Sequence, residues 1–127
     1  MDQTIVAKLI EKAKLASETA YCPTSENPVG ACVLTQNGML FSGCNIELSS
    51  FAGSLGAMEV ALSKAISEGA TSIRMVVNYC DKEISFPTGA EREFMKEFAE
   101  KATIICATNG KFEQFQMREL LPFSMKN

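Results

Sequence analysis

The side chains in this chain that could do chemistry are mainly those that carry oxygen. The chain has no histidine, and its five cysteines contain no Cys-x-x-Cys pair, so the common imidazole and thiolate metal patterns are missing. Glu59, Thr88 and Glu91 lie near the starts of two expected helices and carry side-chain oxygens. Such oxygens can bind a hard cation, and the two carboxylates could also act as a general acid or base. Carboxylates at a helix N-terminus more often serve only to offset the helix dipole. Both interpretations stay open, and the sequence favours the dipole role.

The cysteines are expected to be reduced thiols. Their number is odd, and the chain starts with acidic and polar residues rather than a secretory signal, which is typical of a cytoplasmic protein. Cys32, Cys44 and Cys106 fall in or beside expected strands, where a small buried hydrophobic role is usual. Cys22 and Cys80 are placed in loops, with the same role expected.

Composition favours a single ordered domain over residues 1–127. Apolar residues make up 46% of the chain, and no apolar run approaches the roughly 18 residues of a membrane span. The net charge is −3, and Lys and Arg are scattered rather than gathered into a basic stripe. We therefore expect neither a nucleic-acid partner nor a membrane partner.

Apolar periodicity and turn residues predict eight elements. They are a helix carrying the apolar stripe from Ile5 to Ala20, strands 29–34 and 39–44 around Asn37-Gly38, a helix at 55–68, a strand at 73–79, a helix at 89–98, and strands 102–107 and 112–117. Residues 45–54 are expected to be irregular. This order predicts an α/β three-layer sandwich, a mixed five-stranded sheet with helices on both faces.

A family resemblance rests on residues 28–35 (PVGACVLT), 43–47 (GCNIE) and 64–69 (KAISEG). This pattern resembles the cytidine deaminase family, in its small homotetrameric, zinc-dependent type, which includes blasticidin S deaminase-like members. The resemblance covers nearly the whole chain and implies the cytidine deaminase fold.

The chain departs from that family where the family's chemistry is made. The resemblance places the three zinc thiolates on Gly56, Thr88 and Glu91, and the proton-shuttling glutamate on Met58. Catalytic zinc takes three protein ligands and lowers the pKa of bound water from ~15.7 to roughly 7. Glycine has no ligand atom, a threonine hydroxyl is a poor zinc donor, and a thioether cannot transfer a proton. Glu59 is rotated by about 100° from Met58 on a helix and is expected to point elsewhere. We predict no zinc, no other cofactor and no catalytic residue of the family type.

Part of the family's substrate pocket is kept. The resemblance implies that Asn45 and Glu47 bind the ribose hydroxyls and that the backbone of Ala57 contacts the base. It also implies that Phe51 contacts a neighbouring subunit. An amide and a carboxylate suit a diol. Asn45 could equally stabilise the turn at the strand end, and Ala57 could be packing alone.

Two aromatic rings that stack on the base in the family are missing, since their positions fall on Asn27 and Met125. Each stacked ring is worth ~1–3 kcal/mol, so weak pyrimidine affinity is expected. Phe123 could supply a substitute ring or make a plain hydrophobic contact.

These observations predict a cytidine deaminase-like protein without a zinc site that does not deaminate cytidine. It would bind a nucleoside or another small molecule, or act as a non-catalytic subunit. The alternative is a hydrolase of a nucleoside or related amidine, with a rebuilt non-zinc site of Glu59, Glu91 and Thr88. A purely structural homo-oligomer is the third possibility. The expected partners are further copies of the chain in a dimer or tetramer, a paralogous deaminase subunit, or a nucleoside-like small molecule.

Overall fold

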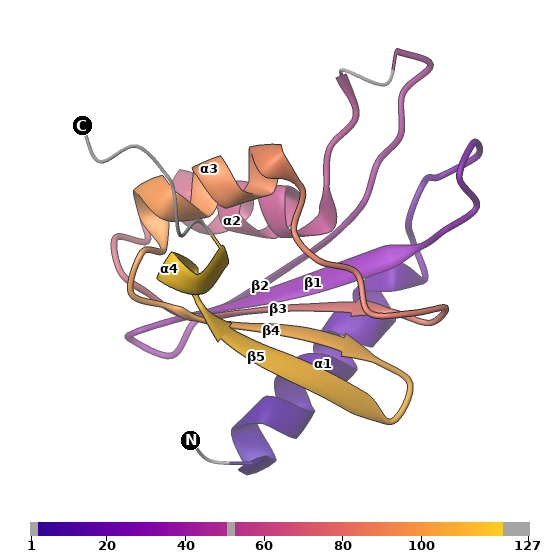
Figure 1. The fold of residues 1–127 in the computed structure, drawn as a ribbon. Helices are drawn as coiled ribbons and strands as arrows, with labels where there is room; N and C mark the ends of the chain where they lie inside the picture. Colours follow the sequence, from indigo (N-terminus) through magenta and orange to yellow (C-terminus); the bar gives the residue numbers. More distant parts are fainter. Residues whose placement is uncertain (1–2, 51–52, 121–127) are drawn as a thin grey trace.

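The structure describes residues 3–50 and 53–120. Their strands form one mixed five-stranded sheet (Figure 1). In this computed structural model the strand order is β2-β1-β3-β4-β5. The elements are α1 (Gln3–Ser17), β1 (Val29–Thr35), β2 (Leu40–Cys44), α2 (Ala57–Ser67), β3 (Ile73–Cys80), α3 (Gly89–Phe98), β4 (Thr103–Thr108), β5 (Lys111–Gln116) and α4 (Met117–Leu120). Strands β3 and β4 pair in parallel, and the other neighbours pair antiparallel. The predicted α/β fold with a mixed five-stranded sheet is confirmed.

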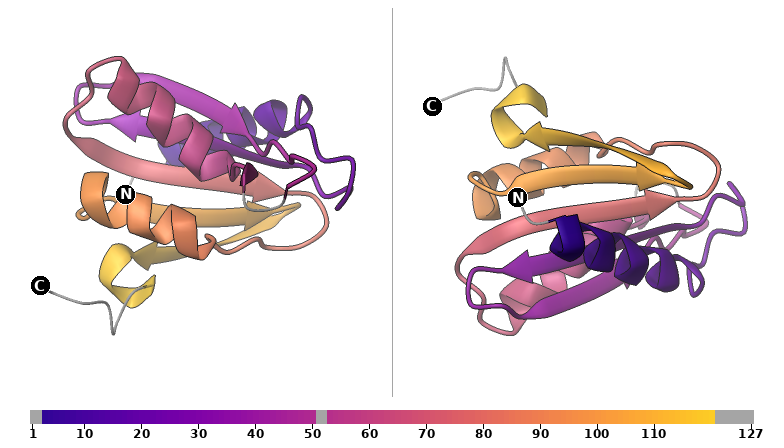
Figure 2. Two further views of the ribbon diagram at one scale, coloured as in Figure 1. Left: turned by 90° about the horizontal axis from the view of Figure 1, so that it is seen from above. Right: turned by 90° about the horizontal axis from the view of Figure 1, so that it is seen from below.

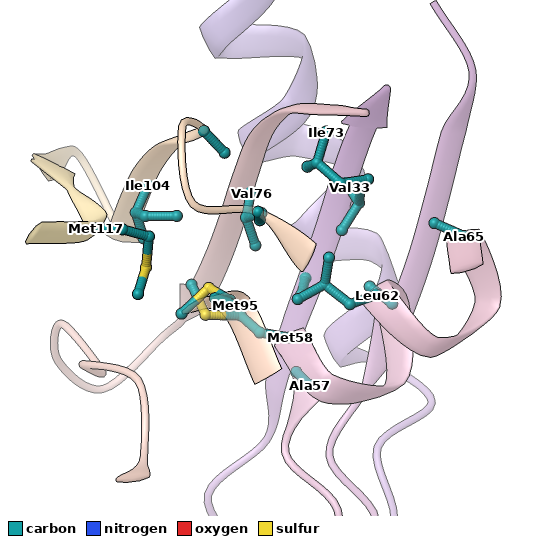
Figure 3. Close-up of a cluster of buried hydrophobic side chains, with 14 of the residues drawn as sticks. Val33, Ala57, Met58, Leu62, Ala65, Ile73, Val76, Met95, Ile104 and Met117 are labelled. Carbon is teal, nitrogen blue, oxygen red and sulfur yellow. The ribbon is translucent and has the colours of Figure 1, made fainter. Parts of the chain in front are cut away.

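Helices cover both faces of the sheet. Helix α1 lies on one face against β1 and β3, and α2 and α3 lie side by side on the other (Figure 2). Side chains alternate along β3, so Met75 and Val77 join the core under α1, whereas Val76 joins the core under α2 and α3. Figure 3 shows that second core, where the side chains of Met58 and Met95 lie together.

Helix α1 is shorter than its apolar stripe suggested. Val6, Leu9 and Ala13 are buried as expected, but the helix ends at Ser17 rather than near Ala20. After Ser17 the backbone N–H groups bond three residues back instead of four, the tighter spacing common at helix C-termini.

Helix α2 begins two residues later than predicted. The backbones of Ile46 and Leu55 exchange two hydrogen bonds, of 2.8 and 2.9 Å, in an isolated antiparallel bridge. This bridge holds Leu55 in an extended conformation and leaves it 41% exposed rather than packed inward. It also places Leu55, which lies just before the start of α2, beside Ile46, which follows β2.

Three further expectations need correction. Phe98 is 41% exposed instead of facing inward, with its ring 5.2 Å from that of Phe94. Cys80 is the last residue of β3 and is buried, not part of a loop. Met117 starts α4, so the polar edge strand β5 ends at Gln116.

Burial keeps two of the strand cysteines protonated. It raises the pKa of Cys32 to about 11 and that of Cys106 to about 12, so neither offers a thiolate near neutral pH. Three residues discussed from the sequence lie outside the described residues. They are Phe51, with its expected subunit contact, Phe123, considered as a substitute ring or a hydrophobic contact, and Met125, where a stacking ring of the family is missing. Among the described helices, none combines the length and the apolarity needed to cross a membrane.

Candidate active site between two helix N-termini

A pocket of about 390 Å³ lies where the N-termini of α2 and α3 face the ends of β2 and β3. Its volume is within the range of about 300–1,000 Å³ usual for small-molecule sites. The polar residues that line it are Asn45, Glu47, Ser54, Glu59, Asn78, Ser85, Thr88 and Glu91. The fold thus brings together the three oxygen-bearing residues singled out in the sequence, Glu59, Thr88 and Glu91, and three predicted binding residues, Asn45, Glu47 and Ala57.

The Glu91 carboxylate joins the two helix starts. It is only 5% exposed. One oxygen accepts the backbone N–H of Thr88 at 3.0 Å, which is half of a capping box at the start of α3. The other oxygen accepts the N–H groups of Met58 at 2.9 Å and Glu59 at 3.4 Å in the first turn of α2. Glu91 therefore caps two helices from one carboxylate, where the positive ends of both dipoles favour an anion.

Gly56 makes room for this carboxylate. It is the N-cap residue of α2 and has no side chain with which to satisfy the first-turn N–H groups. A Cβ placed on Gly56 would lie 2.2 Å from Oε2 of Glu91. Glycine at residue 56 and glutamate at residue 91 are therefore sterically coupled, because Glu91 supplies the cap that Gly56 lacks and uses the space of its missing side chain.

Two opposing effects set the proton affinity of Glu91. Burial raises its pKa above the ordinary value, and the backbone hydrogen bonds from Thr88, Met58 and Glu59 act in the opposite direction. Burial is the larger effect. The group therefore holds its proton to higher pH than an exposed glutamate does.

Met58 and Glu59 face different surroundings, as their rotation on the helix predicts. Met58 is fully buried in the core and does not line the pocket. Glu59 does line it, which corrects the expectation that this carboxylate would point away from the site. Its Oε1 accepts the N–H of Gly56 at 3.2 Å. Ala57 is 2% exposed and lies at the pocket wall.

Asn45 uses both ends of its amide within the chain. Oδ1 accepts the N–H of Val29 at 3.0 Å, and Nδ2 donates to the carbonyl of Asn27 at 3.1 Å. These bonds tie the end of β2 to the loop before β1. They support the turn-stabilising interpretation of Asn45, and its side chain still borders the pocket.

Glu47 holds the loop beside the pocket. Its Oε1 accepts the backbone N–H groups of Thr24 at 3.0 Å and Ser25 at 3.1 Å. Hydrogen bonds from the side chain and backbone of Ser25 and from the backbone of Thr24 lower the pKa of Glu47, so it is an anion at neutral pH. Asn27, where the resemblance expected a stacking ring, receives the Cys80 thiol on its Oδ1 at 3.2 Å.

Sequence reasoning missed Asn78. Its only signal is a polar residue after the apolar residues Met75 to Val77 of β3, and the sequence predicted a strand there without a role for Asn78. The structure places this amide in the pocket wall with 2% of its surface exposed.

The residues present do not fit the zinc that the family resemblance implies. Of the three ligand positions, Gly56 has no side chain, and the Thr88 hydroxyl accepts the N–H of Glu91 at 3.1 Å. Glu91 is engaged with backbone N–H groups through both oxygens. A catalytic zinc needs three protein ligands. Within residues 3–50 and 53–120 no cluster of three His, Cys, Asp or Glu side chains could hold a metal ion.

Comparison with known proteins identifies the family. The family model described as the cytidine and deoxycytidylate deaminase zinc-binding region matches residues 1–80. A cytidine deaminase of Sporosarcina psychrophila is 38% identical over 92% of this chain and 88% of its own length. A probable cytidine deaminase of Dictyostelium discoideum is 33% identical over 96% of this chain and 84% of its own. The crystal structure of cytidine deaminase from Burkholderia pseudomallei superposes with a TM-score of 0.89 at 30% identity, covering 94% of this chain and 98% of that one. The chain belongs to this family of deaminating hydrolases.

These matches contradict the prediction of a deaminase-like protein that only binds a small molecule or serves as a non-catalytic subunit. The relatives that match almost end to end are named cytidine deaminases, which favours the hydrolase alternative. The prediction was wrong because it judged the function from four positions, whereas the similarity extends over the whole fold. The family model itself ends before Thr88 and Glu91.

The coupling of Gly56 to Glu91 predicts a clash. Gly56→Ala should lower the free energy of unfolding by about 2 kcal/mol, because the new Cβ displaces the carboxylate from the first turn of α2. In a Glu91→Ala background the same change should cost at least ~1 kcal/mol less, as measured by urea denaturation in a double-mutant cycle. Gly89→Ala is the matched control, since nothing lies within 4 Å of its added Cβ. Additive costs at residues 56 and 91 would contradict the coupling.

The raised pKa of Glu91 predicts a pH dependence of stability. Below its ordinary value of 4.5 both the folded and unfolded chains are protonated, so the contribution of this group is fully present there. It is lost as the pH rises through the higher folded pKa. The stability of the unmodified chain relative to Glu91→Gln should therefore fall from pH 4.5 towards neutrality, as measured by urea denaturation at each pH. Glu93→Gln, on the exposed side of α3, controls for the change in net charge. A relative stability that rises with pH would show that the N–H donors outweigh burial.

The donor set predicts that protein purified without added metal carries far less than stoichiometric zinc by elemental analysis. Combining Gly56→Cys, Thr88→Cys and Glu91→Cys removes the carboxylate and places thiols at the three positions, so this variant should bind zinc stoichiometrically. Stoichiometric zinc in the unmodified chain would refute the mismatch described above.

Proposed function

We propose that this chain is a hydrolase that removes the exocyclic amino group of a cytidine-like nucleoside or related amidine, without zinc. Family membership and the naming of its relatives as cytidine deaminases support the reaction class. The proposed location of the reaction is the pocket at the starts of α2 and α3.

The buried carboxylate of Glu91 carries this proposal. A carboxylate has about four acceptor sites, and three backbone N–H groups use three of them. About one acceptor site is left for a water or substrate proton. Burial raises the pKa of Glu91, which brings the group closer to the range where it can both take and return a proton.

In the reaction, a pocket water attacks the ring carbon that bears the amino group. A C–O bond forms while Glu91 accepts the proton released by the water. The same carboxyl group then returns that proton to the amino nitrogen, the C–N bond breaks, and ammonia leaves. The hydroxyl that remains on the ring carbon passes its proton to the adjacent ring nitrogen, so the carbon is left as a carbonyl and the ring nitrogen as an N–H. Atoms and charge balance with water as the only co-reactant.

The remaining pocket residues position the substrate in this proposal. Glu47 and Asn45 face the sugar hydroxyls, Ala57 lies against the base, and the Thr88 hydroxyl is a possible donor to the substrate. Glu59 adds a second carboxylate and supports the start of α2 through its bond to Gly56.

Self-association is part of the proposal. Leu48 and Leu55, between β2 and α2, are 51% and 41% exposed. Leu55 also lines the pocket. A second copy of the chain that covers these side chains would bury apolar surface and shield the pocket from bulk water.

Ammonia release tests the proposal. Protein treated with a chelator should release ammonia from cytidine or deoxycytidine, detected by an enzyme-coupled assay and by the change in ultraviolet absorbance. Glu91→Gln should lower kcat by about 10²- to 10⁴-fold, because the amide cannot carry the proton.

Glu93→Gln, on the same helix but away from the pocket, should keep the full rate and controls for the lost charge. Circular dichroism of each variant separates lost chemistry from lost folding. No ammonia from cytidine, deoxycytidine or simple amidines would overturn the proposal, as would turnover that requires added zinc.

A further inference from the structure

Asn78 is a polar side chain where the fold otherwise requires apolar ones. It lies in the central strand β3, whose residues from Met75 to Cys80 are all buried. The amide is 2% exposed. A buried amide that lacks hydrogen bonds destabilises the fold, so a group of this kind needs a partner that explains it.

The orientation of the Asn78 amide is determined by one hydrogen bond. Nδ2 donates to the backbone carbonyl of Ser85 at 2.7 Å. The opposite orientation would place two acceptor oxygens at that distance, which is repulsive. Oδ1 must therefore point away from Ser85, and among the described residues it has no hydrogen-bond partner.

The fold brings the Asn78 side chain to the pocket. Met75, Val77 and Tyr79 belong to the core under α1, so Asn78 projects from the other face of the sheet, towards α2 and α3. Asn78 lines the pocket together with Glu91. The residues paired with it on the adjacent strands, Ala31 and Cys106, are small.

We propose that Oδ1 of Asn78 accepts an N–H of the substrate's exocyclic amino group, which makes Asn78 a specificity-determining residue of this pocket. The inference rests on the proposed function and identifies the exocyclic amino group as the substrate feature that the pocket recognises. The acceptor is already buried, so a ligand with an N–H donor satisfies it, whereas a ligand with a carbonyl in that place leaves it unpaired and adds repulsion.

The same contact favours release of product. Hydrolysis replaces the amino group, a donor, by a carbonyl, an acceptor. The interaction with Asn78 therefore changes from attractive to repulsive when the C–N bond breaks. A pocket of this kind binds the amino form more tightly than the carbonyl form.

Paired ligands test this inference. Binding of cytidine and uridine is measured by isothermal titration in the Glu91→Gln background, where turnover is suppressed, and by brief thermal-shift assays in the unmodified chain. Cytidine should bind at least about tenfold more tightly than uridine. Asn78→Leu should reduce that ratio to about one, because it removes the acceptor but fills the same space. Thr103→Val, at a buried polar residue of β4 outside the pocket lining, should keep the ratio.

Equal affinity for cytidine and uridine in the chain that retains Asn78 would overturn the inference, even if Asn78→Leu fails to fold. So would an unchanged ratio in a folded Asn78→Leu variant. These outcomes are separate from the test of the reaction. If ammonia is released but cytidine binds no more tightly than uridine, the role of Asn78 is refuted and the hydrolase proposal stands. If cytidine binds more tightly but no ammonia is released, the hydrolase proposal fails and the role of Asn78 in binding the amino group stands.

Discussion

The site depends on one carboxylate placed between two helix N-termini. Glu91 satisfies the first-turn N–H groups of α2 and one N–H at the start of α3, so it sets the relative position of the two helices that wall the pocket. A zinc ion held by one ligand at the start of α2 and two at the start of α3 would join the same two helices. Here the link is made by the Glu91 carboxyl group and backbone donors, and Gly56 provides the space that it needs.

A pocket built around the Glu91 carboxyl group differs in its electrostatics from a pocket built around zinc. A zinc site presents a cation, whereas this pocket presents the carboxylates of Glu47, Glu59 and Glu91 and the amide oxygen of Asn78. These groups are hydrogen-bond acceptors, and the hydroxyls of Ser54, Ser85 and Thr88 lie beside them in the lining. A ligand that offers N–H and O–H groups, such as an aminated base with a sugar diol, complements such a surface. The positive ends of the two helix dipoles offset part of the free-energy cost of burying the Glu91 carboxylate.

The order of helices and strands could be predicted from the sequence, because apolar periodicity and the glycines at turns are local signals. Errors arose where a distant contact decided the outcome. The start of α2 was misplaced because Leu55 pairs with Ile46, and Phe98 was judged from its spacing alone. In the site, the sequence singled out Glu59, Thr88 and Glu91, but it missed Asn78 because one polar residue in an apolar strand has no meaning until its neighbours are known.

The sequence by itself determined the fold class and the mismatch at residues 56, 88 and 91, since the identity of a side chain decides whether it can bind a metal. It could not determine which contacts these three residues make with one another. Only the tertiary structure showed that the Glu91 carboxylate lies in the space of the missing Gly56 side chain and that Asn78, a pocket-lining residue, has a buried oxygen without a hydrogen-bond partner among the described residues. Both facts depend on residues more than 30 positions apart or on different strands, and their distances are fixed only when the sheet and helices pack.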